Sequence, residues 1–365
     1  MPPKTSKKRK NPEIVESESS ISQQRSKRPI RHVTIVTNES ENFLAPQRRQ
    51  SECLANLARE DSGLARATND LNIGDISRSS TGSRSSLGSR SSYDMKDLPP
   101  SSVKFATEDM QALNTNFIAS PDKNEVIPDV KVTEFPEQYF LLDVDRKILA
   151  NADFNVRQLE SISNPEVQTF LTKLNSVVLN GIQIIGTVET FTDTCVDDLL
   201  RIAKLNNFPL MIRNQPPRKL RIKDVPCVSS QPDFVIEMQN GAKNNIVVIE
   251  DKHMKNVGQS NGYGETQIAI EILACGSENV RSIDEYKDQT LWAVRVISTY
   301  VTFYKAFISA KYWEELEKGL PKNQSVVVKR WPAKNGWKSG FNFAEPDGRR
   351  EVLTALVKIR QKLLQ

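Results

Sequence analysis

QPDFVIEMQNGAKNNIVVIEDK, residues 231–252, is the stretch that decides the fold of this chain. Two apolar runs, 234–236 and 246–249, flank the turn pair Asn240-Gly241. Apolar runs joined by Asn-Gly favour an antiparallel hairpin. The second run holds four consecutive β-branched residues, which indicates a strand buried on both faces. We therefore expect two paired strands in a sheet that is covered on both sides.

Charged residues follow the second strand directly: Glu250, Asp251 and Lys252. Strand periodicity places Glu250 and Lys252 on one face and Asp251 on the other. The hairpin brings Asp233, at the start of the first strand, near the same end. Two carboxylates and one ammonium group therefore converge at the edge of an apolar sheet.

Carboxylates held close together repel each other unless a cation lies between them, and a hard divalent ion with oxygen ligands meets that need. A bound Mg²⁺ can activate a water molecule and neutralise charge on a phosphate. Lys252 can orient that water or stabilise the negative charge of the transition state. The alternative is structural: Glu250 and Lys252 form a salt bridge at a strand end, while Asp233 caps a turn.

Pro232-Asp233 and, seventeen residues later, Glu250-Asp251-Lys252 resemble the PD-(D/E)xK nuclease superfamily. The resemblance covers residues 165–310 and implies a restriction-endonuclease-like core, in which the second and third strands of a mixed sheet carry the motif. It implies metal-dependent hydrolysis of phosphodiester bonds in nucleic acid, with DNA favoured over RNA and Mg²⁺ or Mn²⁺ as the ion. Asp233 and Glu250 would be metal ligands and Lys252 the catalytic lysine. The layout is most similar to the branch found in fungal Crinkler-type and mobile-element proteins.

The resemblance implies two further site positions. Many members add an acidic residue on the first helix, where Asp193 is the first choice and Glu189 and Asp197 are alternatives. Many members also carry a catalytic-site glutamine on the helix after the third strand, and Gln267 matches it. The aromatic residue that often follows four positions later is Glu271 here, so this chain departs from the pattern at that point.

Apolar periodicity outside the hairpin predicts an α/β fold with a mixed sheet flanked by helices. Residues 151–365 are expected to form this nuclease-like domain, and residues 101–150 an irregular arm that contains several prolines. The predicted helices span 164–180, 192–205, 265–275, 312–318 and 349–364, and residues 291–309 are expected to supply two more strands.

The first hundred residues differ from the rest in composition. They hold 18 serines and two aromatic residues, with 17 Lys and Arg against 12 Asp and Glu, whereas the remainder carries 33 of each charge. A segment so poor in apolar residues buries too little surface to order itself, so residues 1–100 are expected to be a long disordered basic tail. Its SRSSxG repeat over residues 77–93 is either a solvated linker or an array of phosphorylation sites.

Targeting signals are few. Lys7, Lys8, Arg9 and Lys10 form a basic cluster that favours recognition by the nuclear import machinery, although an ordinary basic terminus has the same composition. No apolar segment suits a secretory signal or a transmembrane helix. The four cysteines lack CxxC spacing and only two histidines are present, which argues against zinc sites and a disulfide framework and favours a reducing compartment.

Basic residues outside the tail form two groups. One group precedes the Pro-Asp motif and is either a phosphate-binding edge or a solvated strand; it consists of Arg213, Arg218, Lys219, Arg221 and Lys223. The other interleaves lysine and arginine with Trp331 and Trp337 over residues 329–338, which suits stacking of single strands or partly buried structure.

Two other functions stay open. Residues 101–365 carry no net charge, which favours a catalytically inactive nucleic-acid-binding or protein-interaction module on the same fold, because a nuclease benefits from a positive field. Alternatively the tail is the functional part, as a phosphorylation-regulated scaffold.

Overall fold

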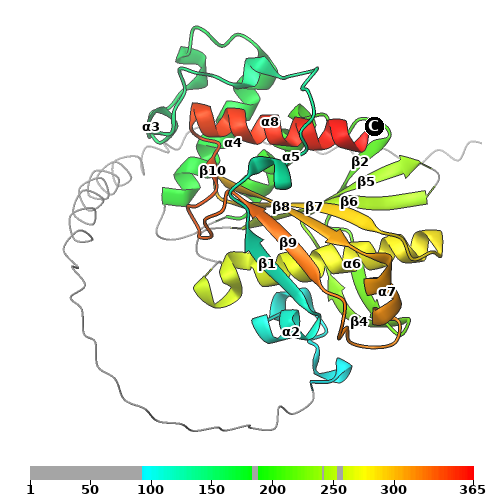
Figure 1. Cartoon of the computed structure of the whole chain (residues 1–365). Coiled ribbons are helices and arrows are strands. Elements are labelled where there is room, and N and C mark those ends of the chain that lie inside the picture. Colours follow the sequence, from blue (N-terminus) through cyan, green and yellow to red (C-terminus); the bar gives the residue numbers. More distant parts are fainter. Residues whose placement is uncertain (1–92, 183–187, 241, 253–257) are drawn as a thin grey trace, which may run out of the picture. The chain divides into compact units, whose positions relative to one another are not determined.

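Figure 1 shows the computed structural model of the chain, which describes residues 93–182, 188–240, 242–252 and 258–365. Its centre is an eight-stranded mixed sheet. The strands are β1 (Thr115–Ala119), β2 (Leu210–Asn214), β5 (Phe234–Asn240), β6 (Ala242–Lys252), β7 (Gln289–Ile297), β8 (Tyr300–Ile308), β9 (Val326–Trp331) and β10 (Phe341–Asn342). They are ordered β1-β9-β8-β7-β6-β5-β2, with β10 paired to β8, and only the pairs β1/β9 and β6/β7 are parallel.

The predicted hairpin is confirmed. β5 and β6 are antiparallel, with Phe234 opposite Ile249 and Asn240 opposite Ala242. Val247 and Ile249 are fully buried, as the β-branched run predicts. The chain then crosses over through α6 (Glu265–Ile283) and returns as β7, parallel to β6. β6 therefore lies inside the sheet, between β5 and β7, and its last three residues, 250–252, pair with β7 beyond the start of β5.

Helices cover both faces of the sheet (Figure 1). On one face, α4 (Pro165–Ile182), α5 (Thr190–Ile202) and α8 (Pro346–Leu363) share a core with Ile249 and Val294. On the other face, α6 packs against Val235 and Ala293 in a second core. This alternation of neighbouring strand residues between two cores is what a sheet buried on both sides requires.

The remaining elements lie around these layers. A two-stranded sheet of β3 (Arg218–Ile222) and β4 (Val225–Ser230) packs on α6, and α7 (Ala310–Leu316) follows β8. Two short helices, α2 (Thr107–Ala112) and α3 (Arg146–Leu149), occur before α4. The 3-10 turns are η1 (Met95–Asp97), η2 (Ser102–Lys104), η3 (Lys123–Glu125), η4 (Glu137–Tyr139), η5 (Val156–Gln158) and η7 (Gln259–Gly264).

The predicted α/β class and the five predicted helices are confirmed as α4, α5, α6, α7 and α8. Their boundaries follow local chemistry. The Asn164 side chain accepts from the backbone N–H of Glu166 at 2.8 Å and so caps α4, which begins with Pro165 at the position that proline favours. The helix predicted over residues 265–275 continues to Ile283, where Asp284 adopts a left-handed conformation (φ 52°) and ends it.

Residues 101–150, predicted to be an irregular arm, are part of the same packed unit. β1 extends the main sheet by pairing with β9, and Val126, Ile127 and Leu149 are buried in the core under α4 and α8. Leu98, within the predicted tail, is also buried. Residues 1–92 lie outside the described part of the chain. Over the residues that are described, no helix combines the length and apolar character needed to cross a membrane.

Candidate active site

The centre of the candidate site is Glu250, near the end of β6. Its side chain is 1% exposed and faces α6, where the Gln267 amide donates to it at 2.6 Å. The same amide nitrogen donates to Glu271 at 2.9 Å. Gln267 and Glu271 are four residues apart and therefore share one face of α6. One glutamine thus holds two carboxyl groups from two elements side by side.

Glu271 is fully buried, and burial is the largest of the causes that raise its pKa well above the ordinary value. The negative charge of Glu250 and the hydrogen bond between the two carboxyl groups raise the pKa further, while the Gln267 bond opposes the shift. Two buried carboxylates that contact each other repel if both are ionised, so the pair favours holding one proton between them. Sequence reasoning noticed Glu271 only as a departure from a motif.

Asp233 lies beside this pair. It immediately precedes β5, and its carbonyl oxygen accepts from the backbone N–H of Gln215 at 2.8 Å. Its side chain is half-buried, and its charge contributes to the raised pKa of Glu271. Three of the predicted residues, Asp233, Glu250 and Gln267, are therefore gathered on the α6 side of the sheet.

The backbone of Lys252 ends β6 and is paired with Ile297 of β7, two residues beyond the Glu250–Arg295 pair. Its side chain lies outside the described part of the structure, so its predicted role stays a prediction. Strand periodicity assigns it to the same face as Glu250.

Asp193, the predicted first-helix acid, is in the first turn of α5. That helix packs on the face of the sheet opposite α6, so Asp193 does not share the face that holds Gln267 and Glu271. Its Oδ1 atom is buried and accepts no hydrogen bond from the described residues. Of the two alternatives, Asp197 forms an ion pair with Arg201 at 2.8 Å, and Glu189 is the N-cap residue of α5.

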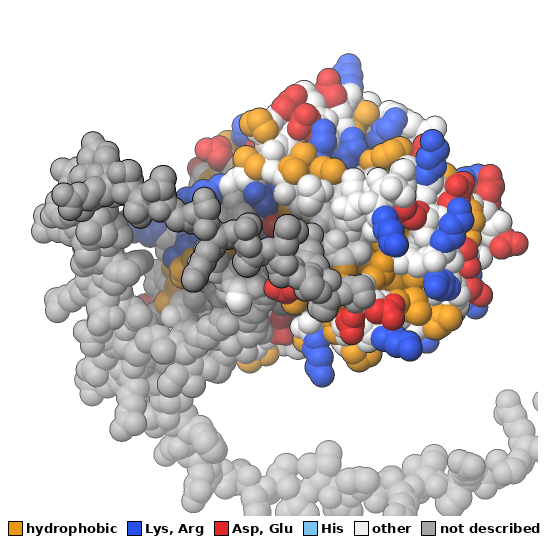
Figure 2. Space-filling view, turned by 60° about the horizontal axis from the view of Figure 1, so that its bottom comes forward, with side chains coloured by type: hydrophobic (Ala, Val, Ile, Leu, Met, Phe, Trp, Pro, Cys, Tyr) orange, Lys and Arg blue, Asp and Glu red, His pale blue; other side chains and the backbone are white. Residues whose placement is uncertain are grey.

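The predicted phosphate-binding group is divided in the structure. Arg213 and Arg218 both form ion pairs with the buried Glu237, at 3.0 and 2.7 Å. Their guanidinium groups therefore neutralise a carboxylate of the protein itself. Arg221 contacts Asp224, whereas Lys219 and Lys223 are exposed. On the face drawn in Figure 2, lysine and arginine side chains are interspersed with aspartate and glutamate. A role in phosphate binding stays a prediction.

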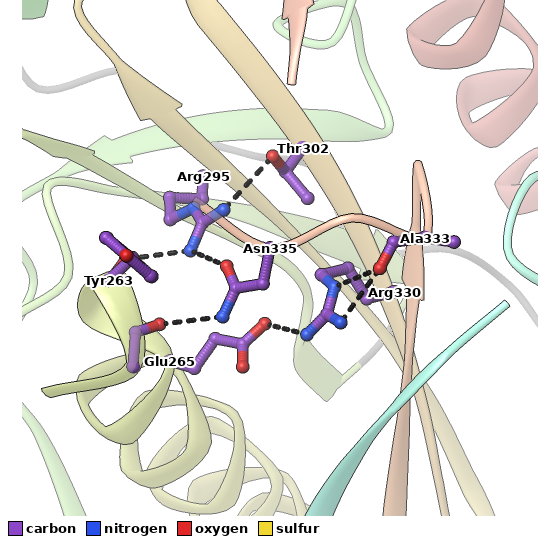
Figure 3. Close-up of polar contacts among 8 residues, drawn as sticks. Tyr263, Glu265, Arg295, Thr302, Arg330, Ala333 and Asn335 are labelled. Carbon is purple, nitrogen blue, oxygen red and sulfur yellow. Dashed lines mark hydrogen bonds and ion pairs between the residues drawn. The ribbon is translucent and has the colours of Figure 1, made fainter. Parts of the chain in front are cut away.

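A second polar cluster flanks the site (Figure 3). Arg295, the register partner of Glu250, is 1% exposed and donates to the Tyr263 carbonyl at 2.7 Å and to Asn335 at 3.0 Å. Asn335 in turn donates to the Gly262 carbonyl at 3.1 Å. These bonds hold the segment before α6 against the loop that follows β9. An arginine inside the apolar stretch 291–297 was the one sequence signal for this cluster.

Glu265 and Arg330 complete the cluster. They form an ion pair at 2.6 Å, with side chains 9% and 11% exposed. Burial raises the pKa of Glu265, and the charge of Arg330 is the largest influence in the other direction. Arg330 also donates two bonds to the Ala333 carbonyl, at 3.1 and 2.9 Å. The first turn of α6 is therefore anchored to β9.

The chemistry of the donor set fits a hard cation. Asp233 and Glu250 offer carboxylate oxygens, and Mg²⁺ is commonly held by one or two carboxylates together with water. Within the residues that the structure describes, no group of three or more His, Cys, Asp or Glu side chains is arranged to hold a metal ion.

Comparison with known families and proteins gave no match. No family model matches the chain, and a search of curated proteins returned no significant relative.

Proposed function

We propose that this protein is a metal-dependent hydrolase of phosphodiester bonds in nucleic acid, with DNA favoured over RNA, on a restriction-endonuclease-like core. Chain order supports the proposal. Within the main sheet and its helices, α5, β2, β5, β6, α6 and β7 form a helix, three antiparallel strands, a crossover helix and a strand parallel to the third. The separate two-stranded sheet of β3 and β4 is inserted between β2 and β5. In this order Asp233 immediately precedes the second strand and Glu250 belongs to the third, which agrees with the positions that the resemblance implies.

The observation that carries the proposal is the 2.6 Å hydrogen bond from Gln267 to Glu250. A motif match by chance gives no reason for a glutamine on the following helix to reach the motif carboxylate. The resemblance implies a glutamine on this helix, and Gln267 at that position donates to the motif carboxylate Glu250 as well as to Glu271.

The roles follow from position. Asp233 and Glu250 would hold the divalent ion, which when bound supplies an activated water and neutralises negative charge on the phosphate. Gln267 orients the Glu250 carboxylate towards that site. Glu271 shares a proton with Glu250 and so limits the negative charge of the buried pair. Lys252 donates to the attacking water or to the phosphate oxygens.

One observation favours the second candidate, an inactive binding module on the same core. Glu250 is 1% exposed and Glu271 is fully buried, so both carboxyl groups are as enclosed as structural core residues. A site of this kind can persist as a polar element of the core without catalysis.

The test compares full-length protein with Asp233→Asn and Lys252→Met on labelled single-stranded and duplex DNA and RNA, with Mg²⁺, Mn²⁺ or a chelator. The matched controls are Asp153→Asn and Lys147→Met, which change exposed residues of the same types. We expect cleavage by the wild type and both controls, loss of at least about a hundredfold in each site variant, and no cleavage with chelator. Thermal unfolding verifies that all five proteins fold.

Two results separate the candidates. Equal cleavage by Asp233→Asn and the wild type would remove the site from the reaction. Binding of nucleic acid without cleavage under every metal condition would favour the inactive module.

Nuclear import through Lys7, Lys8, Arg9 and Lys10, which lie outside the described residues, belongs to the same proposal. Replacing these four residues with glutamine in a fluorescent fusion should reduce nuclear accumulation, and unchanged accumulation would contradict the assignment.

A further inference from the structure

One part of the central sheet has an unusual surface: the face of β8, β9 and β1 opposite α6. The pairing register places Lys305 beside Lys329, and Lys329 beside Ile118; it also places Phe307 beside Val327. Register partners point to the same side of a sheet. The intervening residues, Ala306 and Val328, point the other way into the core around α6. We call the five side chains Ile118, Lys305, Phe307, Val327 and Lys329 the lysine–phenylalanine face.

This face is open, although α4, α5 and α8 cover other parts of the same side of the sheet. Phe307 is 53% exposed, Ile118 39% and Val327 36%, so three large apolar side chains on adjacent strands contact solvent. A hollow of about 370 Å³ lies over Phe307 and Val327 and the two lysines, lined also by Glu125, Thr290 and Ser325. Strand positions on an open face ordinarily carry polar residues, and apolar ones are ordinarily covered by another element. A cluster of exposed apolar side chains therefore marks a contact site.

The charge of the face is unbalanced. Lys305 and Lys329 are directly opposite each other on adjacent strands, an arrangement that destabilises a sheet. Glu125 contacts Lys329 at 3.4 Å and offsets one charge. Lys305 has no carboxylate within ion-pair distance among the described residues. Burial, followed by the charges of Lys329 and Lys362, lowers its pKa. An anion placed between the two lysines would relieve their repulsion.

We propose that the lysine–phenylalanine face binds single-stranded nucleic acid, with phosphates between Lys305 and Lys329 and a base stacked on Phe307. An exposed ring beside unpaired positive charge is the combination that single-strand binding surfaces use. An acidic protein segment would satisfy the lysines but gain less from a flat aromatic ring. The choice of nucleic acid rests in part on the proposed function.

This binding surface is separate from the candidate active site. Phe307 is opposite Thr290 at the start of β7, and the partner of Glu250 is Arg295, five residues further along that strand. Five residues of strand span about 16 Å, and the two sites face opposite sides of the sheet. Of the two tryptophans predicted to stack bases, Trp337 is 46% exposed, and its stacking role stays a prediction. Trp331 is packed against Phe341 at 4.4 Å between ring centres, whereas Phe307 is free to stack.

The test uses the full chain in EDTA, where no metal-dependent cleavage occurs, and a fluorescein-labelled 20-mer of deoxythymidine read by fluorescence anisotropy. We expect Phe307→Ala to weaken binding about tenfold, with an unchanged slope of log Kd against log salt. We expect Lys305→Gln to weaken binding and to reduce that slope by about 0.7, the value for one phosphate contact on a single strand. Phe208→Ala and Lys311→Gln, which change exposed residues elsewhere, should match the wild type.

A second measurement locates the contact independently of affinity. Photo-crosslinking with DNA that carries 5-bromodeoxyuridine in place of thymidine should label the peptide that contains Phe307, and the label should disappear in Phe307→Ala. Unchanged affinity in both variants together with no crosslink to β8 would overturn the proposal. So would displacement of the wild-type complex by polyglutamate with no dependence on Phe307, which would indicate an acidic protein partner. Because binding is measured without metal, the binding result can be interpreted even if the protein proves to have no nuclease activity.

Discussion

The amide of Gln267 donates a hydrogen bond to the carboxylate of Glu250 at 2.6 Å, which links α6 to the end of β6. The two residues are seventeen positions apart and reach each other because the chain crosses over the sheet between β6 and β7. The same amide nitrogen serves Glu271, so a single side chain orients both buried carboxyl groups.

Removing the Gln267 amide should therefore destabilise the fold. Gln267→Leu preserves the approximate size of the side chain but leaves two buried carboxyl groups without this donor. We expect a loss of about 2 kcal/mol in the free energy of unfolding at pH 7, measured by urea denaturation. Gln111→Leu, at an exposed helical position, is the control and should change stability little. Equal stability of Gln267→Leu and wild type would show that the bond is energetically unimportant.

The raised pKa of Glu271 predicts a specific pH dependence of stability. A carboxyl group whose pKa is higher in the folded protein binds more protons there than in the unfolded chain. Above the unfolded pKa of about 4.3, stability should then fall as pH rises, by up to about 1.4 kcal/mol per pH unit, until the folded-state pKa is passed. Glu271→Gln, which mimics the protonated acid, should flatten this dependence between pH 5 and 8 and be more stable than wild type at pH 8.

Thermal unfolding at several pH values measures this difference. Asp153→Asn, an exposed substitution, should follow the wild-type curve. Parallel curves for Glu271→Gln and wild type would mean that Glu271 does not carry the extra proton.

Removing one partner of the buried ion pair between Glu265 and Arg330 should strongly lower the free energy of unfolding. Arg330→Met leaves Glu265 buried beside β9 without its cation and removes two bonds to the Ala333 carbonyl. We expect a loss of about 3–5 kcal/mol in the free energy of unfolding. The comparison is Lys287→Met, which breaks the exposed pair with Glu285 and should cost less than about 1 kcal/mol. Similar losses of stability in the two variants would contradict the inference that burial makes the Glu265–Arg330 pair more important than the exposed pair.

Gly276 should tolerate no side chain, although alanine is the better helix former by about 1 kcal/mol. A Cβ atom at this position of α6 would lie 2.6 Å from a ring carbon of the buried Trp313. Gly276→Ala should therefore lose about 1–3 kcal/mol through overpacking, as measured by urea denaturation. Gly258→Ala, whose Cβ would meet nothing closer than Ser260 Oγ at 3.8 Å, should be close to neutral. Stabilisation by Gly276→Ala would show that Trp313 can move aside.

Local patterns in the sequence were sufficient for the hairpin and the long helices. The Asn240-Gly241 turn signal and the β-branched run at 246–249 predict two adjacent strands, and the periodicity of α4 and α8 predicts helices that each bury one side. Such signals depend on neighbours along the chain, so no tertiary information is needed. The same patterns could not predict that β1 pairs with β9, because Thr115 and its partner Val326 are more than two hundred residues apart.

The candidate site divides in the same way. The sequence by itself determined which carboxylates lie at the open end of the β5–β6 hairpin, because strand periodicity and hairpin pairing are local properties of residues 231–252. Only the tertiary structure decided that Glu271 joins Glu250, that Arg295 lies in a polar cluster, and that Phe307 faces solvent. Those three outcomes depend on how α6, β7 and β9 pack across the sheet. Packing between segments that are distant in the chain produces no periodic pattern in the sequence, so it cannot be predicted from local signals.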